Sequence, residues 1–398
     1  MATMIYHAPY ALQPERATAS AIRPIRMLEA FRELGYEVLD ITGDAATRER
    51  RIRALHARLE RGQRIDFLYS ESATIPPFMT ESHHIPTHPF LDLGLLRTCS
   101  RRGIPAGVFY RDLYWKFPEY RERVGQPLAT AMTAAYRIEL AAYNRWCDTV
   151  FLPSERVYPY LSELSRVRLA PLPPGNSLPP VGEAKAQEGP LQILYVGGVG
   201  SHYRFHNLVA AVSQTPGVIL TICTPQELWE AHAGEYPQAQ SPQVRVVHAR
   251  GEALVDLYRD ADICSLAVEP NEYRDFAAPF KFYEYMGYGK PVLSTAGTLN
   301  GEIVAAEKIG WVTDNSVAHI SSLLAHLRDN RHDVTAVAQR CRQVRLHHSW
   351  RARASFVAEH LTDSAAPHTS ASSRSQSPLT APHSAEKCAG EAGKQGQQ

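Results

Sequence analysis

The stretch AAPFKFYEYMGYGKPVLST, residues 277–295, predicts a short amphipathic helix that is followed by a strand. Lys281, Glu284 and Tyr288 fall at i, i+3 and i+7 and therefore share one polar stripe. Three large apolar residues lie off this stripe: Phe282, Tyr285 and Met286. A compact lysine cation, a glutamate acceptor and the free N–H groups of a helix start suit a ligand that carries a diphosphate and a ribose. For a single Lys/Glu pair, a solvated surface helix is the simpler alternative.

The whole string P-x-K-x-x-E-Y-M-x-x-G-K-P-V resembles the donor-site helix of GT-B glycosyltransferases, particularly those of glycosyltransferase family 4. The resemblance implies that Lys281 binds the donor diphosphate and that Glu284 binds the nucleotide ribose. Many members carry a second acidic residue eight positions before that glutamate, in contact with the transferred sugar, but this chain has Phe276 there. The sugar-contacting role is then left to Asp275, to Asn271 or to backbone amides.

Length and composition predict a protein of two domains and a tail. The chain has 398 residues, of which 44% are hydrophobic, so it can bury sizeable cores. The 42 basic and 41 acidic residues give a net charge of +1, which provides no overall attraction to nucleic acid. The six cysteines form no C-x-x-C pair, which argues against a disulfide framework or a zinc knuckle. Without a signal-like N-terminus or a membrane-spanning apolar run, we expect a cytoplasmic protein.

Short apolar runs alternate with longer amphipathic segments, which is typical of parallel sheets with crossover helices. The runs are MIYHAP, EVLDITG, DFLYSE, PAGVFYRD, TVFLPS and VRLAPLP, then LQILYVGG, VILTICT, VRVVHAR, DICSLAV, PVLSTAG and IGWVTD. This α/β pattern predicts two Rossmann-like, doubly wound domains that face a cleft, which is the GT-B arrangement. The predicted parts are an acceptor domain at 1–173, a linker at 174–190, a donor domain at 191–347, a helix at 348–362 that by the resemblance packs back on the first domain, and a disordered tail at 363–398.

The second domain opens with a strand and a glycine-rich turn that contains Gly198 and Gly200. Glycines allow a phosphate to approach the backbone, although such a turn is as often only a tight bend. The resembling family places its donor-phosphate loop here, which implies that Arg204 and Lys281 act together as a cationic clamp. By the same resemblance, His248 lies near the nucleotide base.

Three histidines gather in the first domain, and a metal site is one reading of them: His83, His84 and His88. We disfavour that reading because Pro86 and Pro89 break any helix that would align them, and no carboxylate or cysteine completes a ligand pattern. The loop follows the predicted strand DFLYSE and should reach the cleft. A histidine there is a candidate to bind sugar hydroxyls or the acceptor.

The next strand ends at Arg111 and Asp112 and runs into Tyr114, Trp115 and Tyr120. A carboxylate beside aromatic rings suits a sugar site, while packing between helices is an equal alternative for the rings. Closer to the N-terminus, two polar residues just before a predicted helix are expected in the first cleft-facing loop, and these are Ser20 and Arg23.

The predicted helix at 45–61 is rich in arginine. A solvated face is the usual explanation. The alternative is contact with anionic lipids at the inner face of the membrane, which would suit an enzyme with a lipid-linked acceptor.

The resemblance extends over most of residues 4–361 and implies a retaining, metal-independent glycosyltransferase with no cofactor. It implies transfer from a nucleotide diphosphate sugar to a glycan or lipid-linked acceptor in bacterial surface polysaccharide synthesis. Lys281 and Arg204 would neutralise the departing diphosphate, and Asp112 or His88 would orient or deprotonate the acceptor. Two alternatives remain open, a nucleotide-sugar epimerase of the same fold and a non-catalytic sensor of sugar nucleotides.

Overall fold

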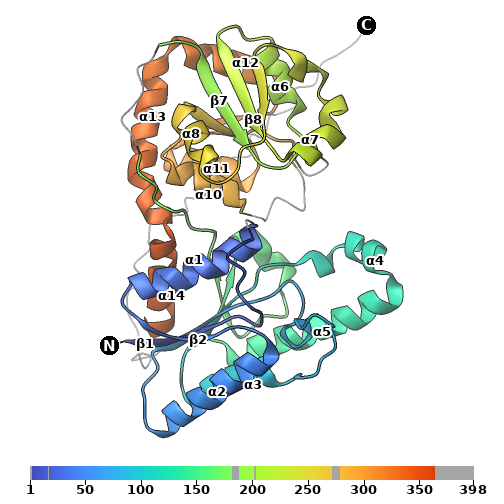
Figure 1. The fold of residues 1–398 in the computed structure, drawn as a ribbon, viewed down its shortest axis with the longest axis vertical. Coiled ribbons are helices and arrows are strands. Elements are labelled where there is room, and N and C mark those ends of the chain that lie inside the picture. The colour runs from blue at the N-terminus through green and yellow to red at the C-terminus, as the bar shows by residue number, and fades with distance from the viewer. Residues whose placement is uncertain (1, 17, 182–187, 201–202, 271–277, 364–398) are drawn as a thin grey trace, which may run out of the picture. The chain divides into compact units, whose positions relative to one another are not determined.

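The computed structural model describes residues 2–16, 18–181, 188–200, 203–270 and 278–363. Within these ranges the chain builds two six-stranded sheets whose strand pairs are all parallel. Each of the twelve apolar runs in the sequence overlaps one strand. The predicted α/β architecture of two doubly wound sheets is therefore confirmed (Figure 1).

The first sheet has the strand order β2-β1-β3-β4-β5-β6. Its strands are β1 (Thr3–His7), β2 (Glu37–Ile41), β3 (Phe67–Glu71), β4 (Ala106–Phe109), β5 (Thr149–Leu152) and β6 (Arg168–Pro171). The helices between them are α1 (Ala19–Glu33), α2 (Ala45–Glu60), α3 (Leu91–Arg101), α4 (Pro118–Val124) and α5 (Gln126–Trp146), with short 3-10 turns η1 (Pro77–Met79), η2 (Tyr114–Lys116) and η3 (Glu155–Tyr160).

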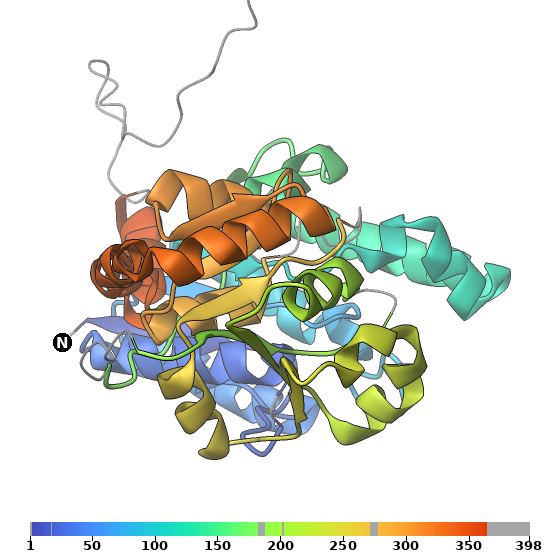
Figure 2. The same ribbon diagram turned by 90° about the horizontal axis from the view of Figure 1, so that it is seen from above.

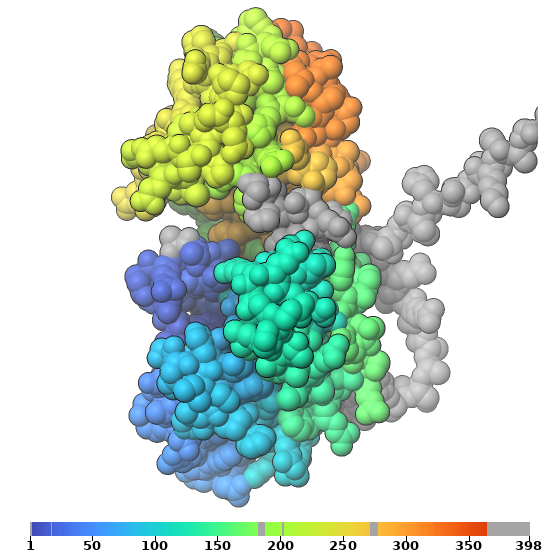
Figure 3. All heavy atoms as spheres, turned by 90° about the vertical axis from the view of Figure 1, so that its right-hand side faces the viewer, coloured from blue at the N-terminus to red at the C-terminus, as the bar shows by residue number. Residues whose placement is uncertain are grey.

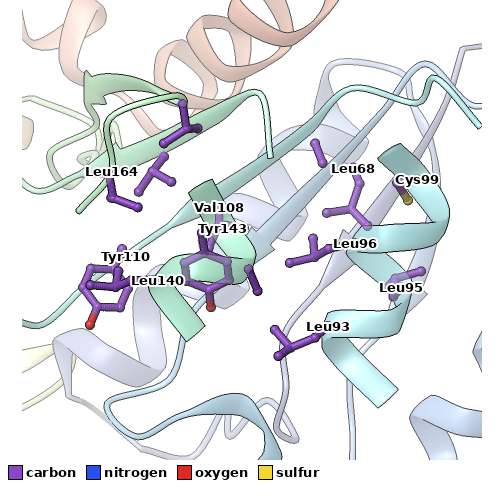
Figure 4. Packing of buried hydrophobic residues seen from close by; sticks show 14 of the residues in the cluster. Leu68, Leu93, Leu95, Leu96, Cys99, Val108, Tyr110, Leu140, Tyr143 and Leu164 are labelled. Atoms are coloured by element: carbon purple, nitrogen blue, oxygen red, sulfur yellow. The ribbon is translucent and has the colours of Figure 1, made fainter. Parts of the chain in front are cut away.

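Alternate residues of these strands enter cores on opposite faces of the first sheet, because successive side chains of a strand point in opposite directions. Ile5, Leu68 and Val108 lie in a core with residues of α2, α3 and α5. Figure 4 shows strand and helix residues of this core interdigitating. Met4 and Phe67 face the other way, into a core shared with α1.

The second sheet has the strand order β12-β11-β10-β7-β8-β9. Its strands are β7 (Leu191–Val196), β8 (Val218–Cys223), β9 (Val244–Val247), β10 (Ile263–Leu266), β11 (Val292–Thr295) and β12 (Gly310–Thr313). One face is covered by α6 (His206–Ser213) and α12 (Val317–Asp329), and the other by α8 (Ala253–Asp260), α10 (Phe280–Gly287), α11 (Leu299–Glu307) and α13 (Arg331–Val344). The remaining described elements are α7 (Gln226–His232), η4 (Ala233–Glu235), η5 (Pro237–Gln240) and η6 (Arg345–His348).

The last helix, α14 (Trp350–Thr362), completes the core of the first sheet although it follows the second sheet in sequence. It packs beside α1 and against β3 and β4. The chain reaches it next to the segment that leaves the first sheet, because Asn176 N–H donates to the His348 carbonyl at 2.7 Å and Trp350 N–H donates to the Asn176 carbonyl at 3.2 Å. Helix α14 thus belongs to the packing of the first domain.

The view from above shows α4 and α5, drawn in teal, projecting from the first domain (Figure 2), and their atoms lie at the front of the space-filling view (Figure 3). Helix α5 packs against α3 and α4. No helix within the described ranges is both long and apolar enough to cross a membrane.

Candidate functional site

The polar stripe of α10 lies at the carboxyl edge of the second sheet. The Tyr285 hydroxyl accepts a hydrogen bond from the Val196 N–H at 2.9 Å and donates to the Val196 carbonyl at 3.1 Å, which fixes α10 to the end of β7. Lys281 Nζ donates to Glu284 Oε2 at 2.7 Å, and the Tyr258 hydroxyl of α8 donates to Glu284 Oε1 at 3.0 Å. Both carboxylate oxygens of Glu284 are therefore held by neighbouring side chains.

The Lys281–Glu284 pair is accessible, with 33% of the lysine side chain and 21% of the glutamate side chain exposed. The pair also lies close to the end of β8, since the charges of both residues interact with the thiol of Cys223, the last residue of that strand. Burial raises the pKa of Cys223, Lys281 lowers it and Glu284 raises it. The pair thus lies near the ends of β7 and β8, at the carboxyl edge of the sheet, which is the edge where open parallel sheets bind ligands.

The glycine-rich turn follows β7 directly. The Gly198 carbonyl accepts a hydrogen bond from the Tyr195 hydroxyl at 2.6 Å. Gly200 has a φ of 117°, a conformation that disfavours any other residue, and a Cβ atom there would lie only 2.8 Å from His232 Nε2. The turn therefore depends on glycine at position 200.

Two further predicted donor residues lie at this edge. Arg204 is exposed, and its carbonyl accepts a hydrogen bond from the Glu269 N–H at 2.8 Å, just after β10. His248 Nδ1 lies 2.7 Å from the Thr224 carbonyl oxygen, so Nδ1 carries the hydrogen and ties the loop after β9 to the loop after β8. All six donor residues predicted from the sequence follow strand ends of the second sheet or lie on α10: Gly198, Gly200, Arg204, His248, Lys281 and Glu284. Their roles remain predictions.

The two candidate sugar-contacting residues, Asn271 and Asp275, lie outside the described residues, as does Phe276.

A pocket of about 630 Å³ lies at the carboxyl edge of the first sheet. Two predicted acceptor residues, Ser20 and Arg111, line it. Arg111 Nη2 donates to the Tyr10 hydroxyl at 2.8 Å, and Nη1 donates to the Ser20 carbonyl at 3.2 Å. Burial raises the pKa of Tyr10, so this lining side chain is a neutral phenol. Charged residues of both signs line the pocket, and these are Arg16, Arg111, Asp44 and Glu81, with further hydroxyls from Thr18, Thr74, Thr80 and Ser82.

Arg23 is not on an open surface, which corrects the sequence prediction. Helix α1 begins at Ala19, so Arg23 lies inside the helix on the buried stripe that also carries Met27. Only 5% of Arg23 is exposed. Its guanidinium pairs with Glu71 at 3.1 Å and lies over the Phe109 ring at 3.4 Å, so it stabilises the first domain from within.

Asp112, His84 and His88 are not among the residues that line this pocket. Asp112 is partly buried, and its Oδ1 accepts a hydrogen bond from the Tyr114 N–H at 2.9 Å at the start of η2. His84 and His88 are exposed, and His84 has a left-handed φ of 52°. In the part of the chain that the structure describes, no three His, Cys, Asp or Glu side chains come together as a metal site.

The aromatic residues after β4 pack inside the first domain. The Trp115 ring stacks on Tyr136 with centroids 5.0 Å apart, and its Nε1 donates to the Tyr110 hydroxyl at 2.8 Å. Tyr120 is also buried and meets Tyr114 edge to face. Of the two alternatives, packing accounts for Trp115 and Tyr120.

Most arginines of α2 already have acidic partners. Arg48 is 2% exposed and pairs with Asp92 at 2.8 Å. The other pairs are Arg51–Asp40 at 3.2 Å, Arg53–Glu49 at 2.9 Å and Arg58–Glu37 at 2.8 Å. The helix therefore offers an anionic membrane surface far less free charge than the sequence predicts.

The carboxyl edge of the second sheet, with its six predicted donor residues, is called the donor edge below. The sequence did not predict two features of this edge, which are Tyr258 and the pair of His232 with Glu235. Helical spacing indicates that Tyr258 is buried but not that its hydroxyl meets Glu284 of another helix. His232 meets Gly200 across a separation of 32 positions, for which the sequence carries no signal.

Residues 204–359 match the family model described as Glycosyl transferase-like. Solved structures share the fold of nearly the whole chain. Sucrose-phosphate synthase from Thermosynechococcus elongatus has a TM-score of 0.60 at 14% identity, over 90% of this chain and 98% of that one. WaaG, a glycosyltransferase involved in lipopolysaccharide biosynthesis, has a TM-score of 0.56 at 14% identity, over 90% of this chain and 99% of that one.

The chain has the GT-B fold, and its second domain matches a glycosyltransferase-like family. Anabaena HepE in complex with UDP-glucose is a further similar structure, with a TM-score of 0.54 at 12% identity over 91% of this chain and 99% of that one. No curated protein sequence matches this chain. The region matched by the family model begins at Arg204 and contains His248, Lys281 and Glu284, so it includes most of the donor edge.

Proposed function

We propose that this chain is a glycosyltransferase that moves a sugar from a nucleotide diphosphate sugar to a glycan or a lipid-linked acceptor, in the synthesis of a surface polysaccharide. The observation that carries the proposal is the accessible Lys281–Glu284 pair, fixed by Tyr258 beside the glycine-rich turn. A lysine cation suits a diphosphate, and a carboxylate with defined orientation suits the two hydroxyls of a ribose. HepE, one of the similar structures, has been solved with UDP and with UDP-glucose.

In this proposal, the second domain binds the donor. Lys281 and Arg204 offset the negative charge that develops on the departing diphosphate, and Glu284 accepts hydrogen bonds from the ribose. His248 lies at the joined loops after β8 and β9, where the base would sit. The donor must compete with Glu284 for Lys281, because the two side chains are hydrogen-bonded in its absence.

The first domain binds the acceptor in its pocket, where Arg111 and Ser20 meet the acceptor hydroxyls. Asp112 follows Arg111 after β4 but does not line the pocket, so in this proposal the attacking hydroxyl extends beyond the pocket to Asp112, which orients or deprotonates it, with His88 as the alternative. We also infer a retaining reaction that needs no metal ion, in which side-chain cations supply the charge that a metal would otherwise bring. Activity that survives a chelator would support this part, and activity restored only by a divalent cation would contradict it.

Incubation of the purified protein with a panel of nucleotide sugars tests the proposal. The expected result is release of nucleotide that depends on an added acceptor, with the sugar recovered on that acceptor. Conversion of the donor to its epimer without acceptor would identify an epimerase, and binding without turnover would identify a sensor. The anomeric configuration of the product, read by nuclear magnetic resonance, decides between retention and inversion.

A further inference from the structure

A histidine from outside the predicted motifs lies against the glycine-rich turn. A Cβ atom at Gly200 would lie 2.8 Å from His232 Nε2 and 3.1 Å from Cε1. The edge of the imidazole ring therefore occupies space that a side chain at position 200 would need. His232 is the last residue of α7, and 30% of its side chain is exposed. The ring is therefore partly open to solvent at the place where the turn would receive a phosphate.

The opposite edge of the same ring is held by a carboxylate. His232 Nδ1 lies 2.6 Å from Glu235 Oε1 in η4, so Nδ1 donates and Nε2 is directed to the turn. The bond with His232 lowers the pKa of Glu235, which keeps this carboxylate ionised. An imidazole between a carboxylate and an incoming anion gains stability when it is protonated, since both neighbours are negative.

Other charged groups face Glu235 from the elements around it. His206, at the start of α6, stacks on Tyr236 with centroids 4.3 Å apart, and its Nε2 lies 3.9 Å from Glu235 Oε2. The positive charge of Arg204 also lowers the pKa of Glu235. The Arg204 carbonyl accepts a hydrogen bond from the Glu269 N–H. Of these groups, His232 is the one in contact with Gly200. His202, next to the turn, lies outside the described residues.

We propose that His232, oriented by Glu235, is a further donor-binding residue that donates a hydrogen bond from protonated Nε2 to the donor diphosphate at the glycine-rich turn. This inference rests on the proposed function, because it requires a nucleotide sugar at that turn. Its consequence is that donor affinity increases as the pH falls through the range in which histidine takes up a proton. The diphosphate of a nucleotide sugar is esterified at both ends and keeps its two negative charges over this range, so the effect originates in the protein.

Calorimetry of UDP-glucose binding without acceptor, at about pH 5.5 and about pH 7.5, tests the inference. We expect the wild-type protein to bind roughly tenfold more tightly at the lower pH, the size of one charge-assisted hydrogen bond. His232→Gln keeps a polar side chain of similar reach but cannot become a cation, so the difference between the two pH values should shrink to about twofold or less.

Two matched variants complete the experiment. His326→Gln removes a histidine that is likewise paired with a carboxylate, Asp333 at 3.2 Å, but on α12 away from the turn, and should keep the wild-type pH dependence. Glu235→Gln should weaken binding at low pH and reduce the pH dependence, because it removes the carboxylate that orients the His232 ring. This second variant also tests the inference if His232→Gln does not fold.

The outcomes separate this inference from the proposed function. A wild-type protein that binds no nucleotide sugar of the panel overturns the proposed function and the inference together. A donor that binds with a pH dependence that survives both His232→Gln and Glu235→Gln overturns the inference alone. Loss of the pH dependence in His206→Gln with its retention in His232→Gln assigns the role to His206 and also overturns it.

Discussion

At the residue scale, the donor edge is held together by ion pairs that a ligand can open. The Lys281–Glu284 pair is partly exposed, and such pairs contribute about 0–1 kcal/mol to stability. Breaking the pair to admit a diphosphate therefore costs little free energy. By contrast, the buried pair of Arg23 with Glu71 cannot be opened without leaving an uncompensated charge in the core, which typically costs about 3–5 kcal/mol.

Replacing Lys281 should affect turnover much more than folding. We expect Lys281→Ala to lower kcat/KM about a hundredfold, because it removes a cation from the leaving diphosphate. The melting temperature should fall by no more than about 2–4 °C, since little buried surface is lost. Lys290→Gln is the matched control, because Lys290 Nζ bonds the Ala261 carbonyl at 2.7 Å at the other end of the sheet. Unchanged activity in Lys281→Ala would contradict the donor-site assignment.

Asp112 is predicted to act on the acceptor side only. Asp112→Asn retains an oxygen that can accept the Tyr114 N–H, so η2 should keep its start. Nucleotide affinity by calorimetry should then stay within a few fold, while transfer to the acceptor falls about a hundredfold, as for loss of a general base. Abolished nucleotide binding, or intact transfer, would make this assignment wrong and direct attention to His84 or His88.

At the element scale, α5 carries a carboxyl group in the core of the first domain. Glu139 is 1% exposed, and the Tyr143 hydroxyl donates to it at 2.6 Å. Burial raises the pKa of Glu139 to about 8, and the bond with Tyr143 only partly opposes this. The folded state therefore keeps a proton on Glu139 at a pH where the unfolded chain has lost it.

This shift predicts that the protein becomes less stable as the pH rises from about 4.5 to about 8. In that range the folded state binds the proton and the unfolded state does not, so the free energy of unfolding falls by up to about 1.4 kcal/mol for each unit. Glu139→Gln should flatten the dependence in urea titrations at several pH values. Glu119→Gln, on the exposed face of α4, should leave it as in the wild type. A wild-type curve that rises over the same range would contradict the prediction.

At the scale of the whole molecule, the first domain depends on the end of the chain. Helix α14 buries Trp350, Ala354, Val357, Ala358 and Leu361. The packing is close, since a Cβ atom at Gly107 of β4 would meet Leu361 Cδ1 at 3.0 Å. The core of one domain is thus closed by a helix that follows the other domain in sequence.

This dependence predicts opposite results for two changes near the C-terminus. Leu361→Ala should cost about 2–5 kcal/mol in the free energy of unfolding, because it leaves a cavity against the first sheet. Removal of residues 364–398, which contain Leu379 as their one large apolar residue, should leave the melting temperature and activity nearly unchanged. A large loss of stability on this truncation, measured by thermal unfolding, would show that the tail contributes to a core.

The sequence by itself determined the twelve strands, because a buried parallel strand is a local apolar run, and it determined the stripe of Lys281 and Glu284, because helical spacing is local. Only the tertiary structure decided which polar groups meet. The sequence predicts that Arg23 lies in a loop, whereas in the structure it is buried and paired with Glu71, 48 positions away. In the sequence His232 is an ordinary residue at a helix end, and only the folded chain places it beside Gly200. Periodicity reports which face of an element is buried, whereas partners brought together from distant positions depend on how the elements pack, and the chemistry of both sites depends on those partners.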